Sequence, residues 1–161
     1  MSVDDAVTMM KPNYDNYCFS ENKLADCMFN SDMVLYCMKS LILHGVKPKE
    51  IVDPNIRTDF NKLAYLVRLD HGLGENFSVI KEIAEQGEIV TEIVTHFSAL
   101  EMTDVGNFKS LLSYFGLLSM KGVDMMGRPI LHIPNLVVRE QLFNFLIQGY
   151  ARHDVFKLDV N

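Results

Sequence analysis

The sequence has 161 residues, which is enough for one domain, or one and a fraction, with a real buried core. Its 48% hydrophobic and 22% charged content is typical of a globular protein and excludes an intrinsically disordered chain. The net charge of −6 argues against nucleic-acid binding, because phosphate contacts require clustered Lys and Arg.

The cysteines, Cys18, Cys27 and Cys37, are odd in number and form no C-x-x-C pair. We therefore expect reduced thiols that act as small hydrophobic groups in a cytoplasmic protein. The first residues, Met-Ser-Val-Asp-Asp, do not have the basic start and apolar run of a signal peptide. No apolar stretch approaches the roughly 18 residues of a membrane span, so we expect no membrane association.

In the first third, residues 4–10 indicate a frayed helix that leads to Pro12, and residues 14–19 alternate as in a short strand or extended loop. A strong helix is predicted next. Asn30 or Ser31 is its N-cap and Gly45 its C-cap. Its predicted buried face repeats at three and four residues and comprises Val34, Leu35, Met38, Leu41 and Ile42.

In the middle third, Thr58 or Asp59 is predicted to begin a second helix, and residues 78–86 a third helix that Gly87 closes. Residues 88–94 are rich in β-branched side chains. Their pattern leaves two alternatives open, a strand or a continued helix.

The last third predicts a helix, a hairpin and a second helix. Asp104 or Asn107 caps a helix that ends at Gly116, and residues 117–120 and 129–133 form two strands around a turn-rich tip. Leu118 should face the core together with Leu131 or Ile133. Asn135 then caps a helix to about Tyr150, an order typical of the end of a winged-helix fold.

These patterns predict a mainly α protein, a helical bundle with a small β-hairpin and a winged-helix-like C-terminal half. The predicted organisation is a lead-in over residues 1–12, a helical subdomain over 13–103, a winged-helix-like subdomain over 104–155, and a tail over 156–161.

Nothing in the sequence points to catalysis. It contains no G-x-x-x-x-G-K-[ST] phosphate loop and no G-x-S-x-G nucleophile elbow. The five histidines have neither the mutual spacing nor the nearby cysteines of a zinc site. We therefore expect a chain that is not an enzyme, holds no metal or cofactor, and does not bind Mg-ATP tightly.

The helix predicted after Asn135 has more apolar surface than docking on one core requires. Val138, Leu142, Phe145 and Leu146 form one stripe. A second stripe comprises Leu136, Phe143, Ile147 and Tyr150. A helix that is apolar on most sides is normally buried on most sides, so we expect the second stripe to bind a partner protein or a second copy of the chain.

Four runs of the sequence carry a family resemblance. They are Tyr14-Asp15-Asn16-Tyr17-Cys18-Phe19-Ser20-Glu21, Val52-Asp53-Pro54-Asn55-Ile56-Arg57-Thr58-Asp59, residues 108–116, and Ile133-Pro134-Asn135-Leu136-Val137-Val138-Arg139-Glu140. Over about residues 12–155 the chain resembles the C-terminal part of a predicted bacterial AAA-ATPase-like family. In that family a nucleotide-binding core comes first, and a PD-(D/E)XK nuclease-like domain often follows.

The resemblance implies a non-catalytic lid or interaction region that regulates or docks on a P-loop core absent from this chain. ATP and Mg²⁺ are implied only for the parent family. In this interpretation Arg57 can reach a nucleotide phosphate, and Tyr14 and Tyr17 can stack on its adenine. The alternatives are a docking loop around Arg57 and simple packing of the two tyrosines. A stand-alone winged-helix nucleic-acid binder is the alternative function.

Overall fold

A computed structural model describes residues 2–53, 74–96, 98–102 and 104–152. The described part is mainly α, with a small antiparallel sheet, as the sequence predicts. The predicted helix that begins at Thr58 or Asp59 lies outside these residues, and so does Arg57. The predicted tail over 156–161 lies outside them as well.

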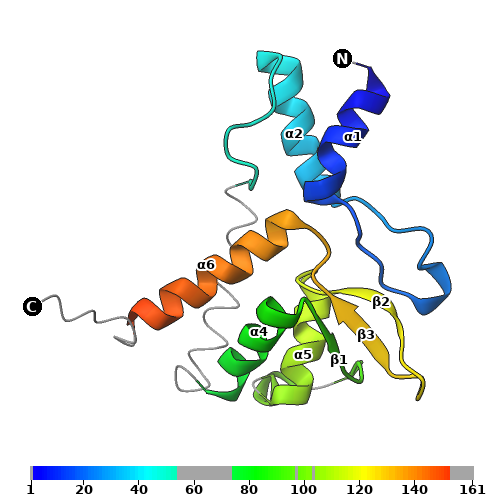
Figure 1. The fold of residues 1–161 in the computed structure, drawn as a ribbon, viewed down its shortest axis with the longest axis vertical. Coiled ribbons are helices and arrows are strands. Elements are labelled where there is room, and N and C mark those ends of the chain that lie inside the picture. The colour runs from blue at the N-terminus through cyan, green and yellow to red at the C-terminus, as the bar shows by residue number, and fades with distance from the viewer. Residues whose placement is uncertain (1, 54–73, 97, 103, 153–161) are drawn as a thin grey trace, which may run out of the picture.

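Figure 1 shows the elements in chain order. They are α1 (Val3–Tyr14), the 3-10 turn η1 (Glu21–Lys23), α2 (Ser31–His44), α4 (Glu75–Gln86), β1 (Glu88–Val90), the 3-10 turn η2 (Ala99–Glu101), α5 (Val105–Tyr114), β2 (Ser119–Val123), β3 (Pro129–His132) and α6 (Leu136–Arg152). The helix–hairpin–helix order predicted for the last third is confirmed by α5, β2, β3 and α6.

Short-range capping interactions set the helix ends where the sequence predicts them. The Asn30 side chain accepts a hydrogen bond from the Met33 N–H at 3.1 Å and begins α2. Gly45 ends α2 in the left-handed conformation, with φ of 71°. Gly87, with φ of 80°, ends α4 in the same way, since glycine adopts this conformation without a Cβ clash.

The first helix is longer than predicted and continues through Pro12 to Tyr14. At its start, Ser2 and Asp5 form a reciprocal capping box, which satisfies two otherwise unpaired backbone donors. Ala6, Met10 and Tyr14 follow at intervals of four residues and are all buried. Burial of this stripe stabilises the helix by more than it loses through the one backbone hydrogen bond that Pro12 removes near the C-terminal end.

The predicted buried face of α2 is partly wrong, because Leu35 and Ile42 are exposed. The fully buried residues are Met33 and Cys37. A helix with apolar residues on most sides does not reveal from its own sequence which side its neighbour covers, and here α1 contacts the Met33 side.

The sheet has three strands in the order β1-β3-β2, all antiparallel (Figure 1). Residues 88–94, which the sequence left undecided, supply the strand β1. It pairs Glu88 with His132 and Ile89 with Leu131. The prediction of a two-stranded hairpin is therefore corrected to a three-stranded sheet.

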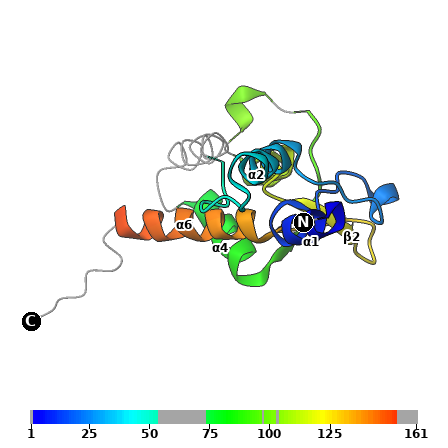
Figure 2. The ribbon, with the colours of Figure 1, turned by 90° about the horizontal axis from the view of Figure 1, so that it is seen from above.

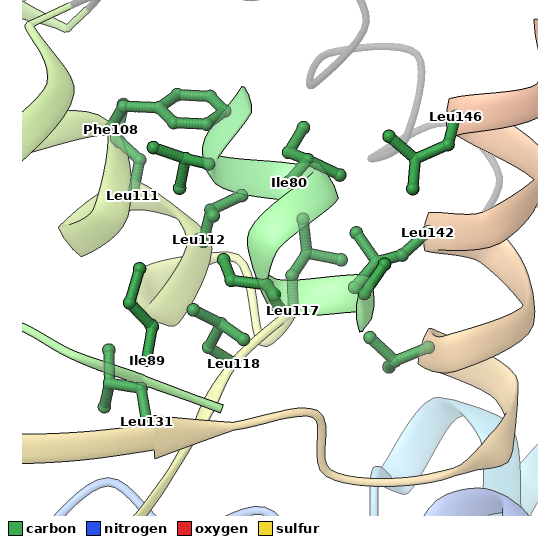
Figure 3. Close-up of a cluster of buried hydrophobic side chains, with 14 of the residues drawn as sticks. Ile80, Ile89, Phe108, Leu111, Leu112, Leu117, Leu118, Leu131, Leu142 and Leu146 are labelled. Carbon is green, nitrogen blue, oxygen red and sulfur yellow. The ribbon is translucent and has the colours of Figure 1, made fainter. Parts of the chain in front are cut away.

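The larger core lies between α4, α5, α6 and the sheet. Figure 3 shows Ile80 of α4 between Leu112 of α5 and Leu142 of α6. Leu118 and Leu131 are both buried in this core, as predicted. Since α4 and β1 share this core with α5, it contains elements from both sides of the subdomain boundary predicted at residue 104.

The smaller core joins α1 and α2, and the start of α6 closes it through Val137. The next residue, Val138, belongs to the larger core. Figures 1 and 2 both show α6 beginning beside α1 and then running over α4. The first turn of α6 is therefore the place where the two cores meet.

Buried polar side chains fix the segment after α1 at this meeting place. The Asn135 amide donates to the Asp15 carbonyl at 3.0 Å, while its oxygen accepts from the Val138 N–H at 3.1 Å. The Ser119 hydroxyl accepts from the Cys18 N–H at 2.7 Å and donates to the Asn16 carbonyl at 2.7 Å. Asn16 itself has φ of 73°, a left-handed turn that Asn tolerates better than most residues.

We predict that Asn135→Ala lowers the free energy of unfolding by about 2–4 kcal/mol, because it removes an N-cap and leaves a buried carbonyl without its donor. Urea denaturation measures this change. Asn144→Ala, an exposed position on the same helix, should change stability by no more than about 0.5 kcal/mol. Equal effects of the two substitutions would contradict the proposed role of Asn135.

Candidate functional site

The candidate site is the exposed apolar face of α6, which comprises Leu136, Phe143 and Ile147. Their exposed fractions are 54%, 42% and 61%. The spacings of seven and four residues place them along one side of the helix. The first stripe predicted for this helix lies on the opposite side, where Val138, Leu142 and Leu146 enter the larger core.

Tyr150, which the sequence assigned to the same stripe, is only partly exposed. Its ring lies edge-on to Phe77 of α4, with a centroid distance of 5.2 Å and an interplanar angle of 87°. Phe145 also contacts Phe77, at 6.0 Å. Tyr150 thus helps to hold the end of α6 on α4 and lies at the margin of the exposed face.

Exposed polar residues flank the apolar face and interrupt it. Arg139, Asn144 and Gln148 lie on its sides, whereas Glu140 lies within it, four residues after Leu136 and three before Phe143. An apolar centre with a polar margin is the usual composition of a protein–protein interface. The described part of α6 thus exposes apolar and polar side chains on the same side of the helix.

The two tyrosines singled out in the sequence are buried, as in the packing alternative. The Tyr14 hydroxyl donates to the Ile51 carbonyl at 3.0 Å, and burial raises the pKa of Tyr14 far above its ordinary value. Burial also raises the pKa of Tyr17, against the opposing effect of hydrogen bonds with Asn135 and Asn30. Stacking of either ring on an adenine stays a prediction, and these contacts do not support it.

The basic side chains of the β2–β3 hairpin are paired with acids. Lys121 forms an ion pair with Glu88 of β1. Arg128 donates from Nε to Asp124 at 2.8 Å and from a terminal nitrogen at 2.7 Å. The pKa of Asp124 is lowered mainly by the hydrogen bond that its carboxylate accepts from the Arg128 backbone N–H. The sequence did not indicate the Lys121–Glu88 pair because β1 was not assigned.

An open hollow of about 550 Å³ lies at the end of α2. Its lining contains Lys39, His44 and Lys49, and the remaining lining residues are Tyr36, Ser40, Leu43, Pro48 and Glu50. The carbonyl end of a helix disfavours an anion such as phosphate, so this hollow is a poor nucleotide site despite its two lysines.

Within the described ranges, no group of three His, Cys, Asp or Glu side chains is arranged to hold a metal ion. Among the same residues, no helix has the length and apolar character needed to cross a membrane.

Comparison of the chain with protein-family models, curated proteins and solved structures yields no match.

Gly149 allows the contact between α6 and α4 to be close. A Cβ at this position would lie 2.9 Å from Cζ of Phe77 and closer still to Cε2. We predict that Gly149→Ala lowers the free energy of unfolding by about 1 kcal/mol or more, because overpacking outweighs the gain in helix propensity. Thermal and urea denaturation measure the change.

Gly106→Ala on α5 is the matched control, because a Cβ there meets no atom within 4 Å. It should be neutral or stabilise the protein by up to about 1 kcal/mol. A stabilising effect of Gly149→Ala would show that Phe77 moves aside at little cost.

Proposed function

We propose that this chain is a non-catalytic lid or interaction region that docks on a P-loop core which the chain itself does not contain. The observation that carries the proposal is the exposed apolar face formed by Leu136, Phe143 and Ile147. The family resemblance of the sequence supplies the identity of the partner. Since the sequence has no phosphate loop, nucleotide binding and hydrolysis belong to that core.

The attachment of α6 supports a docking role. Its first turn is fixed by the Asn135 cap, its opposite side is buried through Leu142, and its end is held by the contact of Tyr150 with Phe77. A helix held at both ends loses little conformational entropy when a partner covers its free side. The exposed face is therefore preorganised for binding.

One observation favours nucleic-acid binding as the second candidate function. The strand order β1-β3-β2, with α5 directly before the β2–β3 hairpin, is also the order of a winged-helix domain. In such domains the helix before the hairpin enters the DNA groove, and the hairpin contacts the backbone.

The charges of these elements favour the interaction region instead. On α5, Lys109 is the one basic residue, and Phe108, Ser110 and Leu111 are buried. On the hairpin, Lys121 and Arg128 are both engaged by carboxylates. A duplex phosphate would have to displace these acids, which weakens its electrostatic attraction.

We predict that Phe143→Gln combined with Ile147→Gln weakens binding to the nucleotide-binding core of an AAA-ATPase-like family protein, expressed as a separate chain. Loss of two apolar contacts at the centre of an interface should cost about 2–4 kcal/mol, which is roughly thirtyfold or more in Kd. Isothermal titration calorimetry measures the affinity. Both side chains are exposed, so stability should change by no more than about 1 kcal/mol.

Leu35→Gln combined with Ile42→Gln is the matched control, because these exposed apolar residues lie on α2. This control variant should bind the core as the unmodified chain does. An equal loss in both double variants would show general surface stickiness. Failure of the unmodified chain to bind the core, or binding that is insensitive to the α6 changes, would contradict the proposal.

We also predict that the chain shows no binding to a random DNA duplex, even at low salt, because its hairpin cations are already paired with acids. Fluorescence anisotropy of a labelled duplex tests this. A salt-dependent rise in anisotropy would instead support the winged-helix nucleic-acid binder.

A further inference from the structure

The loop between α1 and α2 is closed by a single antiparallel bridge between Tyr17 and Met28. The Tyr17 N–H donates to the Met28 carbonyl at 3.0 Å, and the Met28 N–H donates to the Tyr17 carbonyl at 2.9 Å. The next residue inward on one arm is Cys18, and the next on the other arm is Cys27. The bridge therefore brings two cysteines, nine positions apart in the sequence, opposite each other.

This position suits a disulfide. Residues that exchange both hydrogen bonds are followed in an antiparallel pair by a closer, non-hydrogen-bonded pair, whose Cα atoms lie about 4.5 Å apart. Disulfides join Cα atoms about 4.4–6.8 Å apart. The pKa of Cys27 agrees with this pairing: desolvation raises it most, and the nearby Cys18 thiol raises it further.

The two cysteines differ in their access to solvent. Cys27 is exposed, whereas Cys18 is buried at the edge of the larger core. Carbonyl groups of the loop accept weak hydrogen bonds from both thiols: Ser20 accepts from Cys18 at 3.2 Å and Leu24 from Cys27 at 3.4 Å. An external oxidant can thus reach the Cys27 thiol, whereas the Cys18 thiol is shielded from solvent. Cys37 lies in the other core.

We propose that Cys18 and Cys27 form a reversible disulfide with a low-molecular-weight disulfide, such as oxidised glutathione, as the oxidant. Cys27 loses its proton, and its thiolate attacks one sulfur of the oxidant, which releases one small thiol and leaves a mixed disulfide. Cys18 then loses its proton and attacks Sγ of Cys27, which releases the second small thiol. The two protein thiols are oxidised, and the small disulfide is reduced to two thiols.

The disulfide would fix the loop to the sheet. The Cys18 backbone is already held there, because its N–H donates to Ser119 and its carbonyl accepts from the Met120 N–H at 2.8 Å. Oxidation extends this attachment to Cys27 and closes residues 19–26 into a ring. The peptide bond after Lys23, which lies in this exposed loop, should then be harder for a protease to bend into its active site.

The test uses the full chain with Cys37→Ala, treated with oxidised glutathione at mildly alkaline pH. The intact mass should fall by two hydrogen atoms, and a thiol reductant should reverse the loss. After denaturation, trypsin should release the peptide that ends at Lys23 linked to peptide 24–39, which then contains Cys27 alone. In the native oxidised protein, cleavage after Lys23 should be several-fold slower than in the reduced protein.

Cys27→Ser in the unmodified background is the matched control, because this position is exposed and the fold should tolerate the change. It should neither lose two hydrogen atoms nor gain protease resistance. Fragmentation of the linked peptides from the unmodified chain gives the same assignment if Cys37→Ala does not fold. A stable glutathione adduct on Cys27 without ring closure, or a link to Cys37 in the native protein, would overturn the proposal.

Discussion

The bond between Asn135 and the Asp15 carbonyl is the constraint on which the rest of the structure depends. The same side chain caps α6, so one residue sets both where the last helix begins and where the chain leaves α1. Asn135 is 7% exposed, and a buried amide of this kind is stable only when its donor and its acceptor are both satisfied. The Asn135 side chain therefore helps to fix α1 relative to α6, together with the burial of Val137 in the smaller core.

The position of α6 explains why it has both a buried and a free apolar side. Val137 and Val138 enter different cores in its first turn, and beyond that turn the helix rests on α4 through one side only. On the far side, Phe143 and Ile147 enter neither of the two described cores and are exposed. Contiguous exposed apolar side chains often mark an interaction site, which is the role that we propose for this face.

Features set by neighbouring residues could be predicted from the sequence, whereas features set by distant residues could not. The caps at Asn30 and Asn135 depend on backbone groups three residues away, so the pattern of residue types was sufficient. The strand β1 exists because it pairs with β3, about forty residues later in the sequence. The position of Tyr150 likewise depends on Phe77, and the exposure of Leu35 on where α1 lies. Hydrophobic periodicity and strand propensity do not indicate which distant residues will form these contacts.

The hydrogen bond between Cys18 and Ser119 has a consequence for how the chain folds. It joins residues 101 positions apart, and the bond from Asn135 to Asp15 spans 120 positions. Closing such long loops has an entropic cost, so we expect these bonds to form late in folding and to lower the folding rate. During synthesis, α1 leaves the ribosome before α6 does, so α1 reaches its final place only after Asn135 has followed it.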